Sequence, residues 1–410
     1  LMKKILKSLG PGLLFAGAAV GVSHLVQSTR AGADFGFGLL WVLFLAAIFK
    51  YPFFQFGPRY AAATGETLLE GYHKLGKGIL AISYIISFFT MFIIQAAITV
   101  VTAGLATNIF GSFDILTWSA IITIISVLIL LVGKYKLLDG FMKYVILLLT
   151  ICTLIAVTVA LFKNDHTFSY HQIIPNGAVE ITFLIAFLGW MPTSLDISIW
   201  QSIWSIEKEK ISHQKITPKQ AIFDFNIGYI GTILLAVCFI ILGALVMNNT
   251  GQSFSSKGSV FAGQLIELYT QNLGDSTYVF IAVAALTTMF STTITALDAS
   301  PRSMTIANKL LFNTKLKLNY WFWIIFLGIG TYIILKYFSD NMGLLVKIGT
   351  VLSFLTAPFY AVLNYILITG KHTPKEHQPS IYLKVLSICG IIFLIVFSAW
   401  YLLSLYKFSL

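Results

Sequence analysis

Residues 183–202 constrain the fold more than any other part of the chain, and they read Phe183-Leu-Ile-Ala-Phe-Leu-Gly-Trp-Met-Pro-Thr-Ser-Leu-Asp-Ile-Ser-Ile-Trp-Gln-Ser202. The stretch is long enough to cross a bilayer as a helix. Pro192 has no N–H and crowds the carbonyl four residues back, so we expect the helix to open between Phe187 and Pro192, near Gly189. Backbone groups freed at membrane depth must face protein or water, and Asp196 adds a carboxylate there. The stretch predicts a functional site, or alternatively a proline kink with polar residues bonded back to the helix.

A second interrupted stretch favours the functional site over the kink. It runs from Gly10 to Arg30, where Gly17 and Gly21 weaken the helix and polar side chains fill the second half. The stretch at 183–202 lies five spans later. Interrupted spans at corresponding positions of two halves predict an inverted-repeat transporter, here with broken helices 1 and 6 beside the substrate.

Length and composition predict an all-α, polytopic membrane protein. The chain has 410 residues, of which 57% are hydrophobic and 10% are charged. Eleven transmembrane helices are predicted, at 10–31, 37–62, 78–107, 113–133, 141–163, 179–204, 219–247, 276–299, 319–338, 342–369 and 381–406. We expect a cytoplasmic tail at 1–9, the first inverted repeat at 10–168 (helices 1–5), the second at 178–370 (helices 6–10), and the eleventh helix with the C-terminus at 380–410.

Basic residues predict the orientation. They concentrate in the loops expected inside, whereas the outer loops hold Arg30, Lys163, Lys257, Lys336, Lys347 and Lys407. Because positive residues favour cytoplasmic loops, we expect a cytoplasmic N-terminus, a C-terminus outside, and a place in the bacterial inner membrane. The first apolar segment has no cleavage site, so no cleaved signal peptide is expected. The formal net charge of +11 is spread among short loops, which argues against nucleic acid as a partner.

Motifs along nearly the whole chain resemble those of the Nramp divalent-metal transporters. They are Gly10-Pro-Gly12, Arg30-Ala-Gly-Ala-Asp-Phe-Gly-Phe-Gly-Leu-Leu-Trp41, Ala63-Thr-Gly-Glu-Thr-Leu68, Met191-Pro192, Ser291-Thr-Thr-Ile-Thr295 and Ala357-Pro-Phe359. The resemblance implies the leucine-transporter-like fold with its 5+5 inverted repeat, and transport of divalent metal ions by alternating access.

The chain departs from the family where the metal is bound. The family's Asp-Pro-Gly-Asn motif in the first helix corresponds to Gly21-Val-Ser-His24, so its carboxylate is absent. Met191 stands at the family's metal-binding methionine, but Thr193 replaces the histidine of its Met-Pro-His motif. The third span lacks the acidic pair used for proton movement, and Thr350 stands where the tenth helix has a glutamine.

A rebuilt metal site is one expectation. A dehydrated divalent ion needs compensating negative charge in a low dielectric, and Asp196 is the carboxylate well inside a span near a break. His24, Met191 and Asp196 would supply N, S and O ligands suited to Mn, Fe, Co or Zn. Alternatively, Asp196 lies near the inner mouth and either caps a helix or pairs with a basic residue. The predicted substrate-binding residues are Gly21, His24, Met191, Thr193, Asp196 and Thr350; the predicted helix breaks are Gly17, Gly21, Gly189 and Pro192.

Charged residues near the inner ends of later spans form a second group. Asp298 and Arg302 are four residues apart and can pair across one helical turn. With Asp224 they suggest an inner gate or a structural ion pair. Lys50 lies deep in the second span, and the sequence does not identify its partner.

The function expected from the sequence is therefore secondary transport. The leading hypothesis is a carrier of divalent metal ions, Mn- or Fe-like, with altered or absent coupling. The alternative is a carrier of a small organic solute or another ion on the same scaffold, because the metal-binding Asp and the proton-path acids are missing. No paired catalytic residues occur in the spans, so no enzyme is expected. The expected partners are the lipid bilayer and the transported ion or solute; no cofactor is expected apart from a divalent metal as substrate, and no oligomeric state is predicted.

Overall fold

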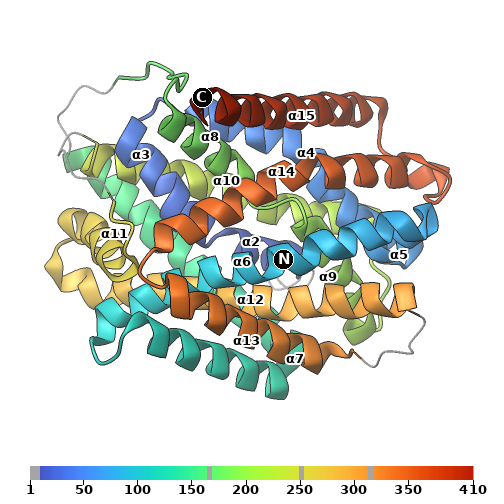
Figure 1. Cartoon of the computed structure of the whole chain (residues 1–410), viewed down its shortest axis with the longest axis horizontal. Coiled ribbons are helices and arrows are strands. Elements are labelled where there is room, and N and C mark those ends of the chain that lie inside the picture. Colours follow the sequence, from blue (N-terminus) through green and yellow to red (C-terminus); the bar gives the residue numbers. More distant parts are fainter. Residues whose placement is uncertain (1–9, 164–168, 249–253, 313–317, 410) are drawn as a thin grey trace.

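A computed structural model describes residues 10–163, 169–248, 254–312 and 318–409 (Figure 1). The tail expected at 1–9 lies outside these residues. The described chain is helical and contains no β-strand. Its helices are α2 (Pro11–Ala19), the π-helix η1 (Ser23–Ser28), α3 (Thr29–Phe35), α4 (Leu40–Thr64), α5 (Leu68–Leu75), α6 (Lys77–Phe110), α7 (Ile115–Lys163), α8 (Ala178–Trp190), α9 (Ile197–Ser212), α10 (Pro218–Val246), α11 (Gly258–Leu273), η2 (Asp275–Thr277), α12 (Tyr278–Phe312), α13 (Tyr320–Phe338), α14 (Met342–Thr369), η3 (Lys375–His377) and α15 (Ile381–Ser409).

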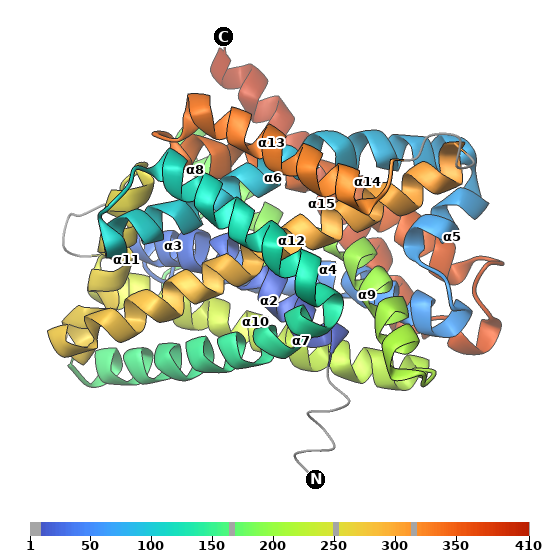
Figure 2. The same ribbon diagram turned by 90° about the horizontal axis from the view of Figure 1, so that it is seen from below.

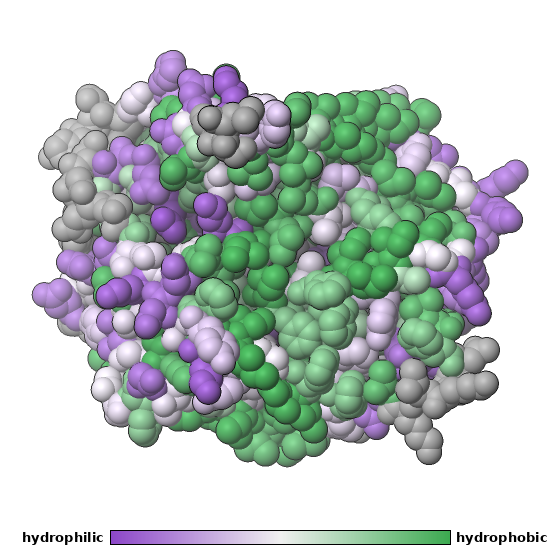
Figure 3. All heavy atoms as spheres, in the orientation of Figure 1, coloured by the Kyte–Doolittle hydropathy of each residue, from purple (hydrophilic) through white to green (hydrophobic). Residues whose placement is uncertain are grey.

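The helices have the length and surface of membrane spans. Eight described helices are long and apolar enough to cross a bilayer, and the bent pair Pro11–Ala19 and Ser23–Phe35 makes up to nine. Helix α7 turns back on itself between a teal and a green arm (Figure 2), and 147–162 within it forms a shorter apolar helix, as does α8. An apolar surface crosses the middle of the molecule between hydrophilic ends (Figure 3). The all-α membrane fold is confirmed, whereas the count of eleven spans and the repeat boundaries stay predictions.

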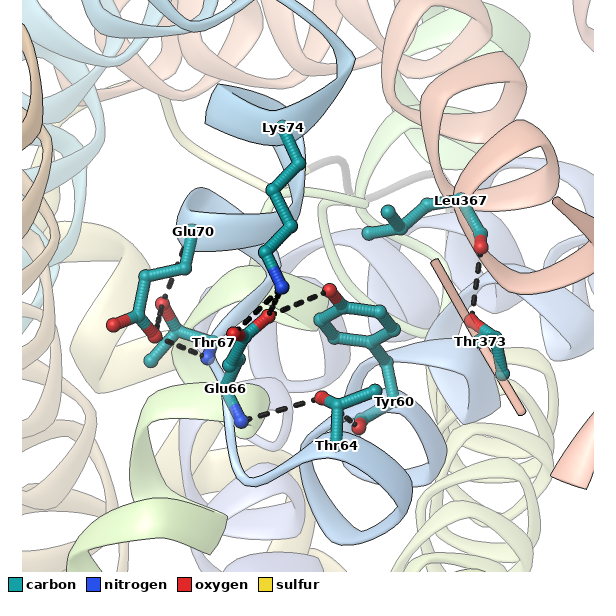
Figure 4. A network of polar contacts seen from close by, with 8 residues as sticks. All are labelled: Tyr60, Thr64, Glu66, Thr67, Glu70, Lys74, Leu367 and Thr373. Carbon is teal, nitrogen blue, oxygen red and sulfur yellow. Dashed lines mark hydrogen bonds and ion pairs between the residues drawn. The ribbon is translucent and has the colours of Figure 1, made fainter. Parts of the chain in front are cut away.

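The loop between α4 and α5 is fixed by local polar contacts (Figure 4). Thr67 and Glu70 form a capping box at the start of α5, because the side chain of each accepts the other's backbone N–H. Lys74 pairs with Glu66 at 2.6 Å, and Tyr60 donates to the same carboxylate at 3.1 Å. These contacts hold α5 against the end of α4.

Helix α10 packs along both α2 and α3. The contact with α2 is close because it is made through glycine: a Cβ on Gly228 would lie 2.0 Å from the carbonyl oxygen of Gly12. The buried carboxylate of Asp224 accepts the backbone N–H groups of Gly10 and Gly12, at 3.1 and 2.8 Å. An acidic group suits this end of a helix, where N–H groups lack partners and the dipole is positive. These two hydrogen bonds attach Asp224 to the start of α2. The contact is structural and separate from the Asp298–Arg302 pair, with which the sequence analysis grouped Asp224.

Removing the Asp224 carboxylate should destabilise the chain. In Asp224→Ala the buried N–H groups of Gly10 and Gly12 lose these acceptors, which costs about 1–3 kcal/mol for each unsatisfied group. We expect a thermal unfolding midpoint several degrees below that of wild type in detergent. Asp340→Ala, at an exposed loop, is the matched control and should leave the midpoint unchanged. Equal midpoints for the two variants would contradict the capping role.

Candidate functional site

Two interrupted spans meet at one small cavity. Helix α8 ends at Trp190 and α9 begins at Ile197, with Pro192 between them; α2 ends at Ala19, and the helix that resumes at Ser23 is bent from it by 45°. The central cavity between these breaks has a volume of about 30 Å³, room for an ion or a water or two. It is lined by Ala18, Ala19, Val22, Ser23, Ile94, Ile98, Trp190, Thr193, Ser194, Ile197, Trp200, Thr292 and Ala296.

The central cavity has a neutral wall. Its polar lining groups include the hydroxyls of Ser23, Thr193, Ser194 and Thr292, and none of the described side chains that line it is charged. Apolar residues of α6 and α12 complete the wall. A divalent ion placed here would find hydroxyl and main-chain oxygens but no carboxylate, so charge compensation must come from farther away.

The first break is stabilised from α12. Thr292 donates to the carbonyl oxygen of Gly17 at 3.0 Å, which satisfies an acceptor at the end of α2. Gly21 lies in the break, and a Cβ there would come within 2.6 Å of the Thr292 hydroxyl oxygen. Gly17, one of the predicted breaks, lies instead within the regular part of α2.

His24 joins the first break to α10. The imidazole is fully buried; its Nε2 lies 2.9 Å from the carbonyl oxygen of Thr232, and its Nδ1 lies 2.7 Å from Ser23 Oγ. If Nε2 carries the proton, it donates to the carbonyl oxygen of Thr232; the Ser23 hydroxyl donates to the carbonyl oxygen of Ala19, which also lies 3.1 Å from Nδ1. Both ring nitrogens therefore have protein partners, and His24 does not line the central cavity.

The second break is held by Lys50, whose partner the sequence did not identify. Its fully buried ammonium donates to the carbonyl oxygens of Leu188, Gly189, Met191 and Thr193 at 2.8, 3.0, 3.1 and 3.0 Å. We call these four oxygens the carbonyl cluster. They include acceptors at the end of α8 that no intrahelical N–H can reach.

Other predicted residues take structural places. Met191 is fully buried, but it is not among the residues that line the central cavity. Thr350 donates within its own helix to Val346 O at 2.7 Å and does not line the central cavity. Gly189 lets α8 approach α14 closely, because a Cβ there would lie 2.0 Å from the carbonyl oxygen of Thr350. Of the predicted substrate-binding residues, Thr193 alone lines the central cavity.

Asp196 lines a separate, inner cavity of about 10 Å³. Its lining brings one carboxylate together with two thioethers and several hydroxyls, from Asp196, Met91, Met304, Ser87, Thr90, Ser300 and Ser303, beside Ile199 and Trp200. Trp200 borders both cavities and so lies between them. The predicted triad of His24, Met191 and Asp196 does not line one cavity in this structure.

A third hollow, of about 230 Å³, completes a series along α8 and α9. It is lined by Gln27, Arg30, Val179, Thr182, Phe183, Ala186, Ser256, Gly343, Val346 and Lys347. Ala186 lies one helical turn, about 6 Å, before Trp190 of the central cavity. We call this third space the outer hollow, after the orientation that the basic residues predict. Outer hollow, central cavity and inner cavity thus follow one another along α8 and α9.

An ionic cluster forms around Asp298 and Arg302, on the stretch of α12 that also carries Ser300 and Ser303 of the inner cavity. Arg302 Nε donates to both carboxylate oxygens of Asp298 at 2.9 and 2.8 Å, and Tyr320 donates to the same carboxylate. The guanidinium lies 4.9 Å from the Tyr320 ring centre and 3.9 Å from Glu207 on α9. The predicted pair of Asp298 and Arg302 therefore connects α12, α13 and α9.

Comparison with known proteins identifies the family. The model of the family described as "Natural resistance-associated macrophage protein-like" (Nramp) matches residues 12–404. The chain belongs to the Nramp family. A Pasteurella multocida protein described as uncharacterized is 36% identical over 401 residues, covering 95% of this chain and 90% of that protein. The divalent metal cation transporter MntH of Staphylococcus saprophyticus is 23% identical, covering 99% and 93%.

Solved structures share the Nramp fold. A variant of the Eremococcus coleocola manganese transporter superposes with a TM-score of 0.76 at 13% identity, covering 97% of this chain and 86% of that one. MHP1, a nucleobase-cation-symport-1 family transporter, superposes with a TM-score of 0.60 at 14% identity, covering 96% of this chain and 92% of that one. The leucine-transporter-like fold predicted from the sequence is thereby confirmed.

Several residues that line the two cavities were not predicted from the sequence. Ser23 and Ser194 lie inside the interrupted stretches, and Thr292 lies in the Nramp-like run at 291–295, so a sequence signal existed for each. Met91 and Met304 had none, because their helices meet Asp196 only in the folded chain.

The close approach of α8 to α14 makes Gly189 sensitive to substitution. In Gly189→Ala the new methyl group meets a backbone oxygen, which cannot rotate away, so the helices must separate. We expect a thermal midpoint lowered by several degrees, or loss of the monodisperse peak in size-exclusion chromatography. Gly231→Ala is the control, because a Cβ there meets nothing within 4 Å; it should be neutral or stabilising. A Gly189→Ala protein as stable as Gly231→Ala would show that the helices are not so close.

Proposed function

We propose that this chain is a secondary transporter that moves divalent metal ions of the Mn²⁺ or Fe²⁺ type by alternating access. Membership of the Nramp family supports the class of function. The names of similar proteins support the substrate: one relative is a divalent metal cation transporter, and one protein of similar fold is a manganese transporter.

The observation that carries the proposal is the series of hollows along α8 and α9. The route would run from the outer hollow into the central cavity between the two breaks, then past Trp200 to the inner cavity. Broken helices beside a mid-membrane cavity are the device by which repeat transporters hold their substrate. Arg30 and Lys347 border the outer hollow; Arg30 interacts with the carboxylate of Asp34, which offsets part of that positive charge.

The ligand chemistry of this route favours a transition metal. At the inner cavity the Asp196 carboxylate supplies a negative charge, and Met91 and Met304 supply thioether sulfur. The carboxylate suits Mn²⁺ and Fe²⁺, and the thioether sulfurs count against the hard ions Mg²⁺ and Ca²⁺, which take oxygen ligands. This set takes the place of the His24–Met191–Asp196 triad, because both nitrogens of His24 already have partners.

The size of the central cavity argues against the alternative substrate. About 30 Å³ accommodates an ion or a water, whereas pockets for small organic molecules are commonly at least ten times larger. A metal ion that has shed most of its water is therefore the better match.

The proposed coupling differs from that of the family pattern. Helix α6 contains no Asp or Glu, and its residues facing the central cavity are Ile94 and Ile98. A proton path along this helix would lack carboxylates, so we propose coupling that is altered or absent. We also propose a cytoplasmic N-terminus, a C-terminus outside and the bacterial inner membrane as location, on the distribution of basic residues.

The Asp196 carboxylate should be required for transport. In Asp196→Asn the side chain keeps its volume but loses its charge, so the inner cavity no longer compensates a divalent cation. We expect uptake of Mn²⁺ into proteoliposomes containing the purified protein to fall at least about tenfold, the effect of 1.4 kcal/mol. Wild type should take up Mn²⁺ in preference to Mg²⁺.

Two controls accompany this measurement. Asp340→Asn removes an exposed carboxylate and should transport like wild type.

Met304→Leu removes a thioether at the inner cavity and should lower the preference for Mn²⁺, whereas Met289→Leu on the same helix should not. Wild type that moves neither ion while folded would overturn the proposed function, and full activity of Asp196→Asn would overturn only the role of Asp196.

The Arg302 cluster should hold the inner side closed. Arg302 connects α9 to α12, so Arg302→Met should favour opening of the inner cavity. A cysteine at Ser87, in a Cys389→Ser background, reports on that opening through its rate of alkylation by a charged maleimide. We expect a rate about fivefold higher, as for an interaction of about 1 kcal/mol. Lys309→Met, which removes an exposed charge from the same helix, should leave the rate unchanged; an unchanged rate in Arg302→Met would argue against a gate.

A further inference from the structure

Lys50 makes an unusual set of contacts for a membrane lysine. Its ammonium is buried among four main-chain oxygens, all between 2.8 and 3.1 Å away and all from the break of one span. An ammonium has three N–H donors, so these four acceptors share them. The oxygens converge on the ammonium as they would on a small spherical cation.

The carbonyl cluster has the character of a cation site. Three of its oxygens belong to Leu188, Gly189 and Met191, at the end of α8 where the helix dipole is negative. Unwound main-chain carbonyls and helix C-termini are the groups that coordinate monovalent cations in broken-helix transporters. Without a cation these oxygens would be left unsatisfied at membrane depth, which is costly.

Two groups beside the cluster attract a positive charge. Asp196, just after the cluster in the chain, interacts electrostatically with Lys50, and the ammonium lies 6.0 Å from the centre of the Phe54 ring. Lysine suits this place because its charge is compact and sits on a flexible stem, unlike the planar guanidinium of arginine. The stem reaches the break from α4, so one side chain connects two spans.

We propose that the break between α8 and α9 is a monovalent-cation site that the chain fills with its own Lys50 ammonium. The tethered ammonium takes the place of a free Na⁺ or K⁺ ion. The interruption between Trp190 and Ile197 is then stabilised at any salt composition. The folded chain therefore has no requirement for a monovalent cation. This proposal concerns the break itself and does not depend on which substrate is carried.

A simpler role for Lys50 is to cap the end of α8. Both roles predict that its removal destabilises the protein, so stability alone does not separate them. They differ in how the truncated protein responds to added cations. A cation site emptied of its tethered ammonium accepts a free cation of the right size, whereas a lost cap is not restored by one cation more than by another.

The test is thermal unfolding of the full chain in detergent, in NaCl, KCl, methylammonium chloride and choline chloride of equal concentration. Choline is too large for the vacated site. We expect the wild-type midpoint to be the same in all four salts. Lys50→Ala should melt roughly 5 °C or more below wild type in choline, and a saturable part of that loss should be recovered with Na⁺, K⁺ or methylammonium.

Two further variants serve as controls for the effect of the Lys50 charge. Lys336→Ala, which removes an exposed lysine, should show no cation-specific response. Lys50→Gln fills most of the same volume without charge and should melt below wild type with no recovery. The proposal fails if a folded Lys50→Ala responds to no cation more than to choline. It also fails if wild type requires Na⁺ or K⁺ for its stability, or if Lys50→Gln is as stable as wild type. Both of these measurements can be made even if Lys50→Ala does not fold.

Discussion

Backbone N–H and C=O groups cannot remain unpaired in a bilayer, and this chain stops being helical after Ala19 and again after Trp190, the ends of two apolar helices. The rest of the structure depends on how those freed groups are satisfied. At the first break a hydroxyl of α12 and the imidazole of His24 connect the opened chain to its neighbours. At the second break the Lys50 ammonium satisfies four carbonyl oxygens together. Each break is thus held open by side chains from other helices.

This arrangement shapes the route that we propose for the substrate. Because neighbouring helices satisfy the breaks, the central cavity is left with hydroxyls and apolar walls rather than charge. The carboxylate of Asp196 lies on the far side of Trp200, with two methionines beside it. A neutral cavity next to a charged one allows an ion to enter without being trapped, since it is attracted onward rather than held between the breaks.

Glycine makes the supporting contacts possible. In a bilayer, helices gain little from the hydrophobic effect against each other, so close packing through small residues is what holds them together. Gly189 brings α8 against α14, and Gly57 brings α4 so near α9 that a Cβ would lie 2.3 Å from Ser198 O. Both contacts flank the second break, and the second lies on the helix that carries Lys50. The rigid support and the opened segment are therefore built from the same helices.

The amino-acid sequence alone was enough to predict the class of fold and the two places where a helix is interrupted. Apolar runs predict spans because only helices satisfy the backbone in lipid, and Gly21 and Pro192 mark the breaks because glycine and proline weaken a helix locally. These are properties of residues close together in the chain, so they can be recognised in the sequence before the fold is known. Which side chains meet at the breaks was settled by tertiary contacts instead. His24 contacts α10, Asp196 lies beside two methionines, and Lys50 extends from α4 to α8. Each of these contacts joins residues far apart in the chain, and no local sequence pattern encodes such contacts.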